Sequence, residues 1–323
     1  RRLSSEVEAR RVEVGGEWIV AGAIGTNSMK IVDIEGEVVG SLPFPLETIS
    51  VKAKNQNVLI GDGVGGNVGG SVSGSVYIGK QTAYLNSSGK YNVGIGFYTN
   101  YTNGPTYSTM IGAEAMRYSS TGTYNVALGY QAMQSSTQTQ HSIGIGRGSL
   151  NNANSAGYNI GIGGYSLVRA GGTGAIAIGY GSGWYASGSG NIFMGYQAGK
   201  GGTTGSPYST GIYNVAIGYE SFLSHTTAAN YNVFVGDMAG KALLTGDDNT
   251  GIGSKALFNI LGSDSTAVGA NAGRYTTGSY NTFVGSDAGL GGTTSAPFSS
   301  GQYNTAVGYQ ALDAFTTGNQ NTA

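Results

Sequence analysis

A six-residue pattern of alternating side-chain types recurs along most of the chain, as in Tyr-Asn-Val-Gly-Ile-Gly at 91–96 and Tyr-Asn-Thr-Ala-Val-Gly at 303–308. We number its positions columns one to six and continue the numbering into the residues that follow. Fifteen copies align on the glycine of column six, at positions 61, 79, 96, 112, 129, 146, 163, 179, 195, 218, 236, 253, 269, 285 and 308. Their spacing is 16 to 18 residues, with two intervals of 23. A short fixed period of this kind predicts stacked coils.

Each copy is typical of a β-strand, in which successive side chains point to opposite faces. Column five is always aliphatic or Met, and column three is Val or Ile in the early copies, apart from Thr109, and Thr in the last four. We therefore expect columns three and five to line one buried face. Column four is Ala or Gly in nine copies, is otherwise large and apolar, and is never charged. One thin coil has a single interior, so column four is expected to face a second copy of the chain across a close contact.

Three further columns have structural interpretations. Column two is Asn ten times and Ser four times, which predicts side-chain hydrogen bonds between coils or to turn backbone. The glycine of column six marks a bend with positive φ or a close backbone approach. Column nine is Ala or Ser in the twelve copies from Gly112 onward, which suggests a short second strand with its small residue inside. The repeat residues chosen to represent these roles are Gly96, Gly129, Gly163, Gly218, Gly253, Gly285 and Gly308, with Asn92, Asn125, Asn159, Asn214, Asn232, Asn281 and Asn304.

Charge divides the chain into unequal parts. Residues 1–54 hold 15 of the 33 charged residues. We expect an N-terminal β module over 1–56, a cap or connector built from two short hairpins, with a helical turn over 4–11. A Gly-rich junction with a first weak repeat spans 57–74, and the β-roll repeats span 75–323. Two intervals of 90 residues, 195–285 and 218–308, indicate a duplicated block of five coils.

Composition excludes several classes of protein. The 323 residues include 59 glycines and no cysteine, so neither disulfides nor Cys-ligated zinc can form. A net charge of −1 argues against nucleic-acid binding, which needs a basic surface. The longest apolar stretch, 18–24, is too short to cross a membrane, so membrane insertion is not expected. The sequence ends at 321–323 inside a further copy, which suggests a segment of a longer product.

The chemistry-bearing residues do not form a recognisable catalytic pattern. His141 and His225 lie in different coils without an evident third ligand, and the adjacent Asp247 and Asp248 suit a turn. We therefore expect no enzyme activity and no catalytic, cofactor-binding or metal-binding residue.

Aromatic residues are the better candidates for recognition. Tyrosine fills column one in eight copies, where we expect stacked rings between coils. Tyr98, Tyr101, Trp184 and Tyr185 lie in loops near polar residues and are candidate glycan contacts, as are the two insertions at 200–212 and 290–302.

Motifs such as Asn-Thr-Ala-Val-Gly-Tyr-Gln-Ala-Leu at 304–312 resemble the repeats of phage tail-fibre shafts, and less closely the heads of trimeric autotransporter adhesins. The resemblance covers roughly residues 75–323. It implies a homotrimeric β-roll in an extracellular attachment structure. The longer coil, the many tyrosines and the 23-residue intervals depart from the autotransporter head and favour the fibre.

These observations predict an all-β rod, a β-roll or β-solenoid, as a homotrimer with a small N-terminal β module. The function that fits best is a shaft of a phage tail or side fibre that presents host-recognition loops or a tip. Its expected partners are copies of itself, upstream fibre or virion components, and a cell-surface glycan or protein receptor. Three alternatives remain: a bacterial trimeric adhesin head, a self-polymerising extracellular filament, and a capsule-degrading tailspike.

Overall fold

A computed structural model describes residues 8–14, 17–23, 28–32, 38–43, 51–54, 56–66, 72–102, 104–153, 157–169, 172–201, 209–225, 229–292 and 298–323, with side chains from residue 56 onward. The described chain is all-β and contains no helix. It divides into two compact units, 1–50 and 51–323.

The described residues of the first unit form two antiparallel hairpins. Strands β1 (Glu8–Val14) and β2 (Glu17–Ala23) pair along their whole length, with Val14 opposite Glu17. Strands β3 (Ser28–Val32) and β4 (Val38–Pro43) form the second hairpin, which has an irregularity at Ile31 and Val32. The predicted helical turn over 4–11 is wrong for residues 8–11. These residues belong to β1, where pairing with β2 outweighs their local helix signals.

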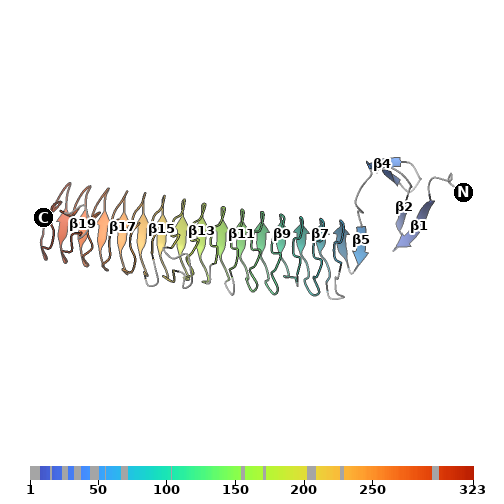
Figure 1. Ribbon diagram of the computed structural model, residues 1–323, viewed down its shortest axis with the longest axis horizontal. Coiled ribbons are helices and arrows are strands. Elements are labelled where there is room, and N and C mark those ends of the chain that lie inside the picture. Colours follow the sequence, from blue (N-terminus) through green and yellow to red (C-terminus); the bar gives the residue numbers. More distant parts are fainter. Residues whose placement is uncertain are drawn as a thin grey trace. The chain divides into compact units, whose positions relative to one another are not determined.

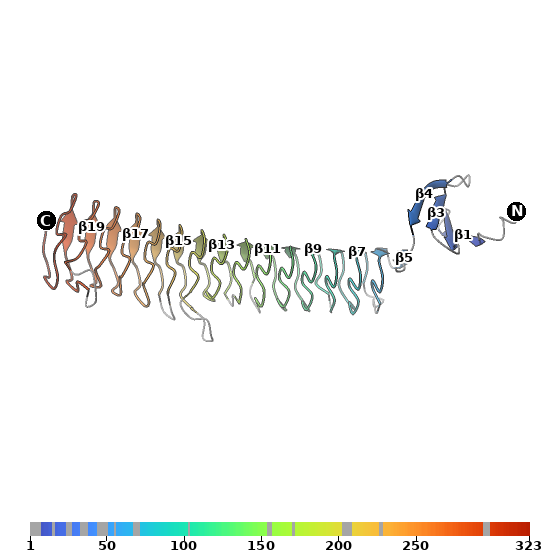
Figure 2. The same cartoon turned by 45° about the horizontal axis from the view of Figure 1, so that its top comes forward.

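The second unit is a parallel β-solenoid, seen as a row of arrows in Figure 1 and from another angle in Figure 2. One 16-stranded sheet runs through the unit with its strands in sequence order. Only the first pair, β5 with β6, is antiparallel. The strands are β5 (Val51–Lys54), β6 (Asn57–Ile60), β7 (Val76–Ile78), β8 (Val93–Ile95), β9 (Thr109–Ile111), β10 (Val126–Leu128), β11 (Ile143–Ile145), β12 (Ile160–Ile162), β13 (Ile176–Ile178), β14 (Ile192–Met194), β15 (Val215–Ile217), β16 (Val233–Val235), β17 (Thr250–Ile252), β18 (Thr266–Val268), β19 (Thr282–Val284) and β20 (Thr305–Val307).

The predicted strands are confirmed, but the predicted assignment of their two faces is wrong. Column four is the interior column, and its residues from Leu59 to Ala306 are at most 2 % exposed in a single chain. Columns three and five point outward and are half-buried or exposed, with Ile111 at 42 % and Val307 at 61 %. The Asn of column two shares the parity of column four and is buried with it. The coil therefore closes around column four, and the aliphatic columns form the outer face of the sheet.

Large and small residues complement each other inside the coil. Column ten, four residues after the motif glycine, also points into the core, as Met133 and Leu257 do. Where column four is Phe, column ten is glycine. A Cβ added at Gly199 would lie 2.1 Å from the Phe193 ring, and one at Gly240 would lie 2.6 Å from the Phe234 ring. Most coils thus hold one large side chain at these two columns. At Gly183 and Gly273, where both columns are small, the Phe193 or Phe283 ring of the next coil approaches instead, which maintains close packing in the thin interior.

The glycine of column six is required by both of the reasons that the sequence suggested. Gly129 and Gly253 each have φ of +131°, in a region that L-residues rarely adopt. A Cβ on Gly253 would also lie 2.4 Å from the carbonyl oxygen of Gly269 in the next coil. The motif glycines therefore stack directly on one another at a spacing that excludes any side chain.

The predicted second strand is absent from the described coils, because the segment after each motif glycine is a series of turns. Columns eight and ten adopt left-handed backbone conformations, for example Gln131 at φ +57° and Met133 at +52°. Hydrogen bonds between coils continue through these turns. The Gln131 amide donates to the Ala113 carbonyl of the preceding coil, and the Met133 amide donates to the Ser149 carbonyl of the following one. The small residue of column nine, such as Ala132, is buried as expected.

The asparagines of column two connect successive coils, as the sequence predicts. The Asn125 side chain accepts a hydrogen bond from the Ser142 amide at 3.0 Å and donates to the Thr139 carbonyl at 2.8 Å. From Asn191 onward, consecutive asparagines also bond directly, and the Asn232 amide donates to Oδ1 of Asn214 at 3.1 Å. These buried side chains satisfy backbone groups that would otherwise have no partner away from water.

The size complementarity of column four and column ten is tested by exchanging the large residue between them. We expect Phe234→Ala to lose about 3–5 kcal/mol of stability through a cavity, and Gly240→Met to lose about 1–3 kcal/mol or more by overpacking. The double variant Phe234→Ala/Gly240→Met reproduces the pair Ala127 and Met133 and should regain most of the loss. Urea unfolding of all three variants measures this, and simple additivity of the two losses would contradict it.

The asparagine column is tested by Asn232→Ala. This change leaves the buried Gly246 carbonyl and the Asn249 amide without their side-chain partner. We expect the free energy of unfolding to fall by about 2–4 kcal/mol, which is the cost of leaving two buried polar groups without a hydrogen bond. Asn319→Ala, at an exposed asparagine that accepts one hydrogen bond from the Gln302 amide, is the control and should stay within about 0.5 kcal/mol. Equal effects of the two changes would refute the special role of column two.

Candidate ligand-contacting surfaces

Column one forms axial stacks of aromatic rings on the outside of the rod, as the sequence predicts. The longest stack described contains Tyr91, Tyr107, Tyr124, His141 and Tyr158, with successive ring centroids 4.9–5.1 Å apart and interplanar angles of 2–23°. Shorter pairs follow at Tyr213–Tyr231 and Tyr280–Tyr303. Their side chains are about half exposed, so each stack presents ring edges and hydroxyls to solvent while its ring faces cover one another.

Tyr98 and Tyr101, two of the predicted glycan contacts, lie together in one half-buried cluster. Their rings meet edge to face at 5.1 Å, and Phe97 and Tyr84 pack against them on either side. The Arg117 guanidinium lies over Tyr98 at 4.4 Å and also pairs with Glu114 at 3.5 Å. One face of the Tyr98 ring is therefore covered by a cation, and the cluster packs between neighbouring coils.

Trp184 and Tyr185, the other predicted glycan contacts, also take part in stacks within the chain. The Trp184 ring is parallel to that of Tyr165 at 4.9 Å and stacks on Tyr185 at 5.6 Å, and the Lys200 ammonium lies 5.8 Å from its centre. Both residues are half-buried. The structure brings these two side chains together, and it places them one coil or more from the Tyr98 cluster rather than in a shared site.

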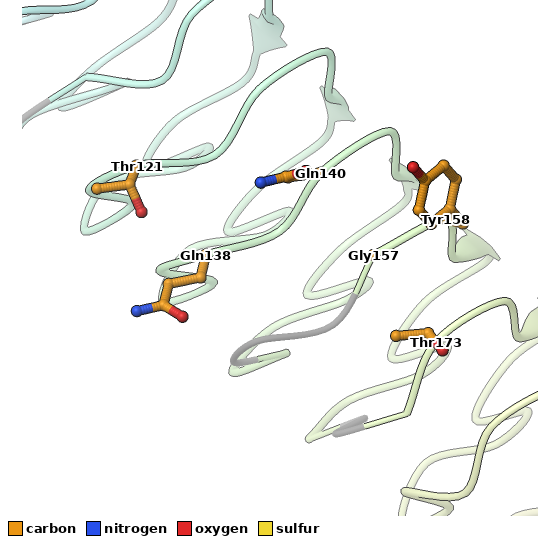
Figure 3. A pocket seen from close by; sticks show the side chains of 6 residues that line it. All are labelled: Thr121, Gln138, Gln140, Gly157, Tyr158 and Thr173. Carbon is orange, nitrogen blue, oxygen red and sulfur yellow. The ribbon is translucent and has the colours of Figure 1, made fainter.

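A groove that sequence reasoning missed runs across three coil boundaries beside the end of the long ring stack (Figure 3). Its volume is about 450 Å³, and its lining residues are Thr121, Gln138, Gln140, Gly157, Tyr158 and Thr173. Thr121, the two glutamines, Tyr158 and Thr173 are exposed, and none of the six is charged. A sequence signal existed, because column one changes from Tyr158 to Gly174 and Gly190 at this point.

The histidines and acidic residues lie in separate environments. His141 is a member of the column-one stack, whereas His225 is fully buried against Phe222, with ring centroids 4.3 Å apart. Asp247 accepts a hydrogen bond from the Asn230 amide at 2.7 Å, and Asp248 is exposed in column one. Among the residues whose placement is described, no three His, Asp or Glu side chains are close enough to hold a metal ion together.

The two predicted insertion sites fall partly outside the described residues, at 202–208 and 293–297. Their described ends rejoin the coils in matching ways. Ser209 forms a parallel β-bridge with Ala186, and its hydroxyl donates a hydrogen bond to the His225 carbonyl at 2.6 Å. Ser299 likewise forms a parallel β-bridge with Thr276, and its hydroxyl donates to the Phe315 carbonyl at 2.8 Å. The two blocks of the 90-residue duplication therefore share this local structure.

In comparisons with known proteins, no family model, no curated protein and no solved structure matches the chain. No helix in the described part of the chain is long and apolar enough to cross a membrane.

The buried histidine makes stability depend on pH. Nδ1 of His225 bonds to the Phe222 carbonyl at 3.2 Å and Nε2 has no partner, so burial lowers the pKa of His225 to about 4 from its usual 6.5. As the pH falls, His225 is protonated in the unfolded chain near pH 6.5 but in the folded chain only near pH 4. The free energy of unfolding should therefore decrease between these two pH values, by about 3 kcal/mol in total. His225→Leu, which copies the buried Leu243 of the next coil, should remove this part of the pH dependence. Unfolding curves at pH 7.5 and pH 4.5 measure it, and an unchanged difference in the variant would show that other groups are responsible.

Proposed function

We propose that the chain is a structural shaft segment of an extracellular attachment fibre, most simply a phage tail or side fibre, and that it works as a homotrimer. The observation that carries the proposal is the outer face of the sheet. Columns three and five form two continuous aliphatic or threonine rows along β6–β20, without a charged residue. In a single chain these rows are open to solvent, and large exposed apolar surfaces of this kind typically mark an interface.

The spacing of the rows favours a copy of the chain as the partner. Neighbouring parallel strands repeat at about 4.8 Å, so the fifteen strands form a face roughly 70 Å long. A partner that fills such a face must present matching side chains at the same interval over the same length. Another copy of the chain has the same strand spacing and the same length, so it meets this requirement. A globular partner would cover only a few strands. The trimer, rather than a dimer, is proposed from the resemblance to fibre-shaft repeats.

A mechanical role follows from the way the coil is built. Every coil contributes a strand and a stacked glycine, and nearly every coil a polar side chain in column two, so length increases by repetition without a new fold. The 90-residue duplication is an instance of such growth. The proposed partners beyond the trimer are upstream fibre or virion components and a receptor glycan or protein on a cell surface.

The oligomeric state is tested by light scattering on the intact chain. We expect one species at three times 32.8 kDa. Lysines placed in the outer rows, Ile145→Lys/Ile178→Lys, should lower the mass or leave the chain insoluble, because the trimer would bury their charges. Lysines at exposed positions outside the sheet, Thr245→Lys/Thr316→Lys, are the charge-matched control and should leave the trimer intact.

Two results of this experiment would contradict the proposal. A wild-type monomer would mean that the outer rows remain exposed in solution. A continuous series of ever-larger species would favour the self-polymerising filament instead. A trimer that binds a host or matrix protein directly, in a gene that encodes a membrane anchor, would favour the bacterial adhesin head.

A further inference from the structure

The long ring stack of column one ends at Tyr158 because the next two coils have glycine there. At Gly174 an added Cβ would meet no atom within 4 Å. At Gly190 a Cβ would lie 2.5 Å from the Tyr213 ring, which leans over it from the following coil. The stack is thus interrupted for two coils, and the space over Gly174 is open.

This interruption leaves one face of an aromatic ring uncovered. Tyr158 is 64 % exposed, compared with 48–54 % for the tyrosines elsewhere in column one. Its other face is covered by His141 at 5.1 Å, with the rings almost parallel at 5°. The ring is therefore held flat by the stack below it while its outer face meets solvent, which makes it a preorganised platform.

Neutral polar groups line the groove along the coils before and after Tyr158. Gln138 and Gln140 alternate with the buried Thr139, so both side chains lie on the groove side of their coil (Figure 3). Thr121 and Thr173 contribute hydroxyls from the coils on either side. Amides and hydroxyls both donate and accept hydrogen bonds, so the groove can satisfy a ligand that carries many hydroxyls.

We propose that the groove beside Tyr158 binds a neutral oligosaccharide, with one pyranose ring stacked on the exposed face of Tyr158. The C–H groups of a pyranose carry a slight positive charge and suit the negative face of an aromatic ring. The sugar hydroxyls bond to the two glutamines and the two threonines. The absence of charge among the six lining residues favours neutral sugars over sialylated or sulfated ones. The volume of about 450 Å³ lies within the range of small-molecule sites.

The proposal names the kind of receptor that the attachment function proposed above would use. It rests on that function only in assuming that the rod reaches a cell surface. It also explains why this groove, rather than the Tyr98 or Trp184 cluster, is the better sugar site. In those clusters Arg117 lies over Tyr98, and Tyr165 and Tyr185 stack on Trp184. At Tyr158 the described part of the chain supplies no such cover over Gly174.

The test uses the intact chain on an array of neutral hexose and N-acetylhexosamine oligosaccharides with their sialylated and sulfated counterparts. We expect the wild type to retain neutral oligosaccharides. Tyr158→Ala removes the platform, and Gly174→Tyr covers it by extending the stack, so each should weaken retention at least tenfold. Gly174 has φ of +68°, close to the +53° to +59° at which column one holds tyrosine, so the second variant should stay folded. Tyr231→Ala, in the same column but away from the groove, is the control and should bind like the wild type.

Circular dichroism melting confirms that each variant is folded before binding is compared. The proposal is overturned if no neutral oligosaccharide is retained, if only anionic sugars are retained, or if Tyr158→Ala and Gly174→Tyr bind like the wild type. Binding of a protein ligand that both variants abolish, with no sugar retained, would assign the groove to a protein receptor instead. A trimeric rod without sugar binding would remove this site alone, whereas sugar binding by a monomer would remove the fibre function alone.

Discussion

The stacking of one motif glycine on the next constrains every other feature of the coil. At column six the backbone has φ near +130° and lies so close to the following coil that a Cβ would overlap its carbonyl group. This contact turns the chain at the same point in every coil and keeps the strands in register. With the register fixed, identical columns coincide along the rod, so the residue in each column lies next to the residue of the same column in the neighbouring coil. The asparagine bridges, the ring stacks and the alternating core all depend on that coincidence.

Much of this arrangement could be predicted from the sequence. The glycine period gave the strands, the order of the sheet and the reason for the glycines. The asparagine bridges and the stacked tyrosines of column one also followed from their recurrence. The assignment of inside and outside was wrong, because both faces of the strand are apolar and alternation alone cannot distinguish them. One signal would have decided it, because glycine occupies column ten wherever Phe193, Phe234 or Phe283 occupies column four. The asparagine of column two favoured the opposite assignment, because it has the same parity as column four and its burial is seen only in the structure.

The candidate site shows a different limit of sequence reasoning. Tyr98, Tyr101, Trp184 and Tyr185 are conspicuous as aromatic residues in loops, yet in the structure their rings pack on one another and on cations. Tyr158 has the same context in the sequence as the other column-one tyrosines. What distinguishes it is a glycine, Gly174, in column one of the next coil. The sequence shows that glycine, but the open space above it, which leaves one face of the Tyr158 ring uncovered, is seen only in the structure.

The central claim is that the outer aliphatic rows are covered by further copies of the chain. Small-angle X-ray scattering tests it most directly, because it gives the mass per unit length of a rod. One chain contributes one coil of 16 to 18 residues for each step of about 4.8 Å, apart from the two longer intervals. The account predicts three times that mass per unit length and a correspondingly thicker cross-section. A mass per unit length equal to that of one chain would contradict the account, because the outer rows would then face water along the whole rod.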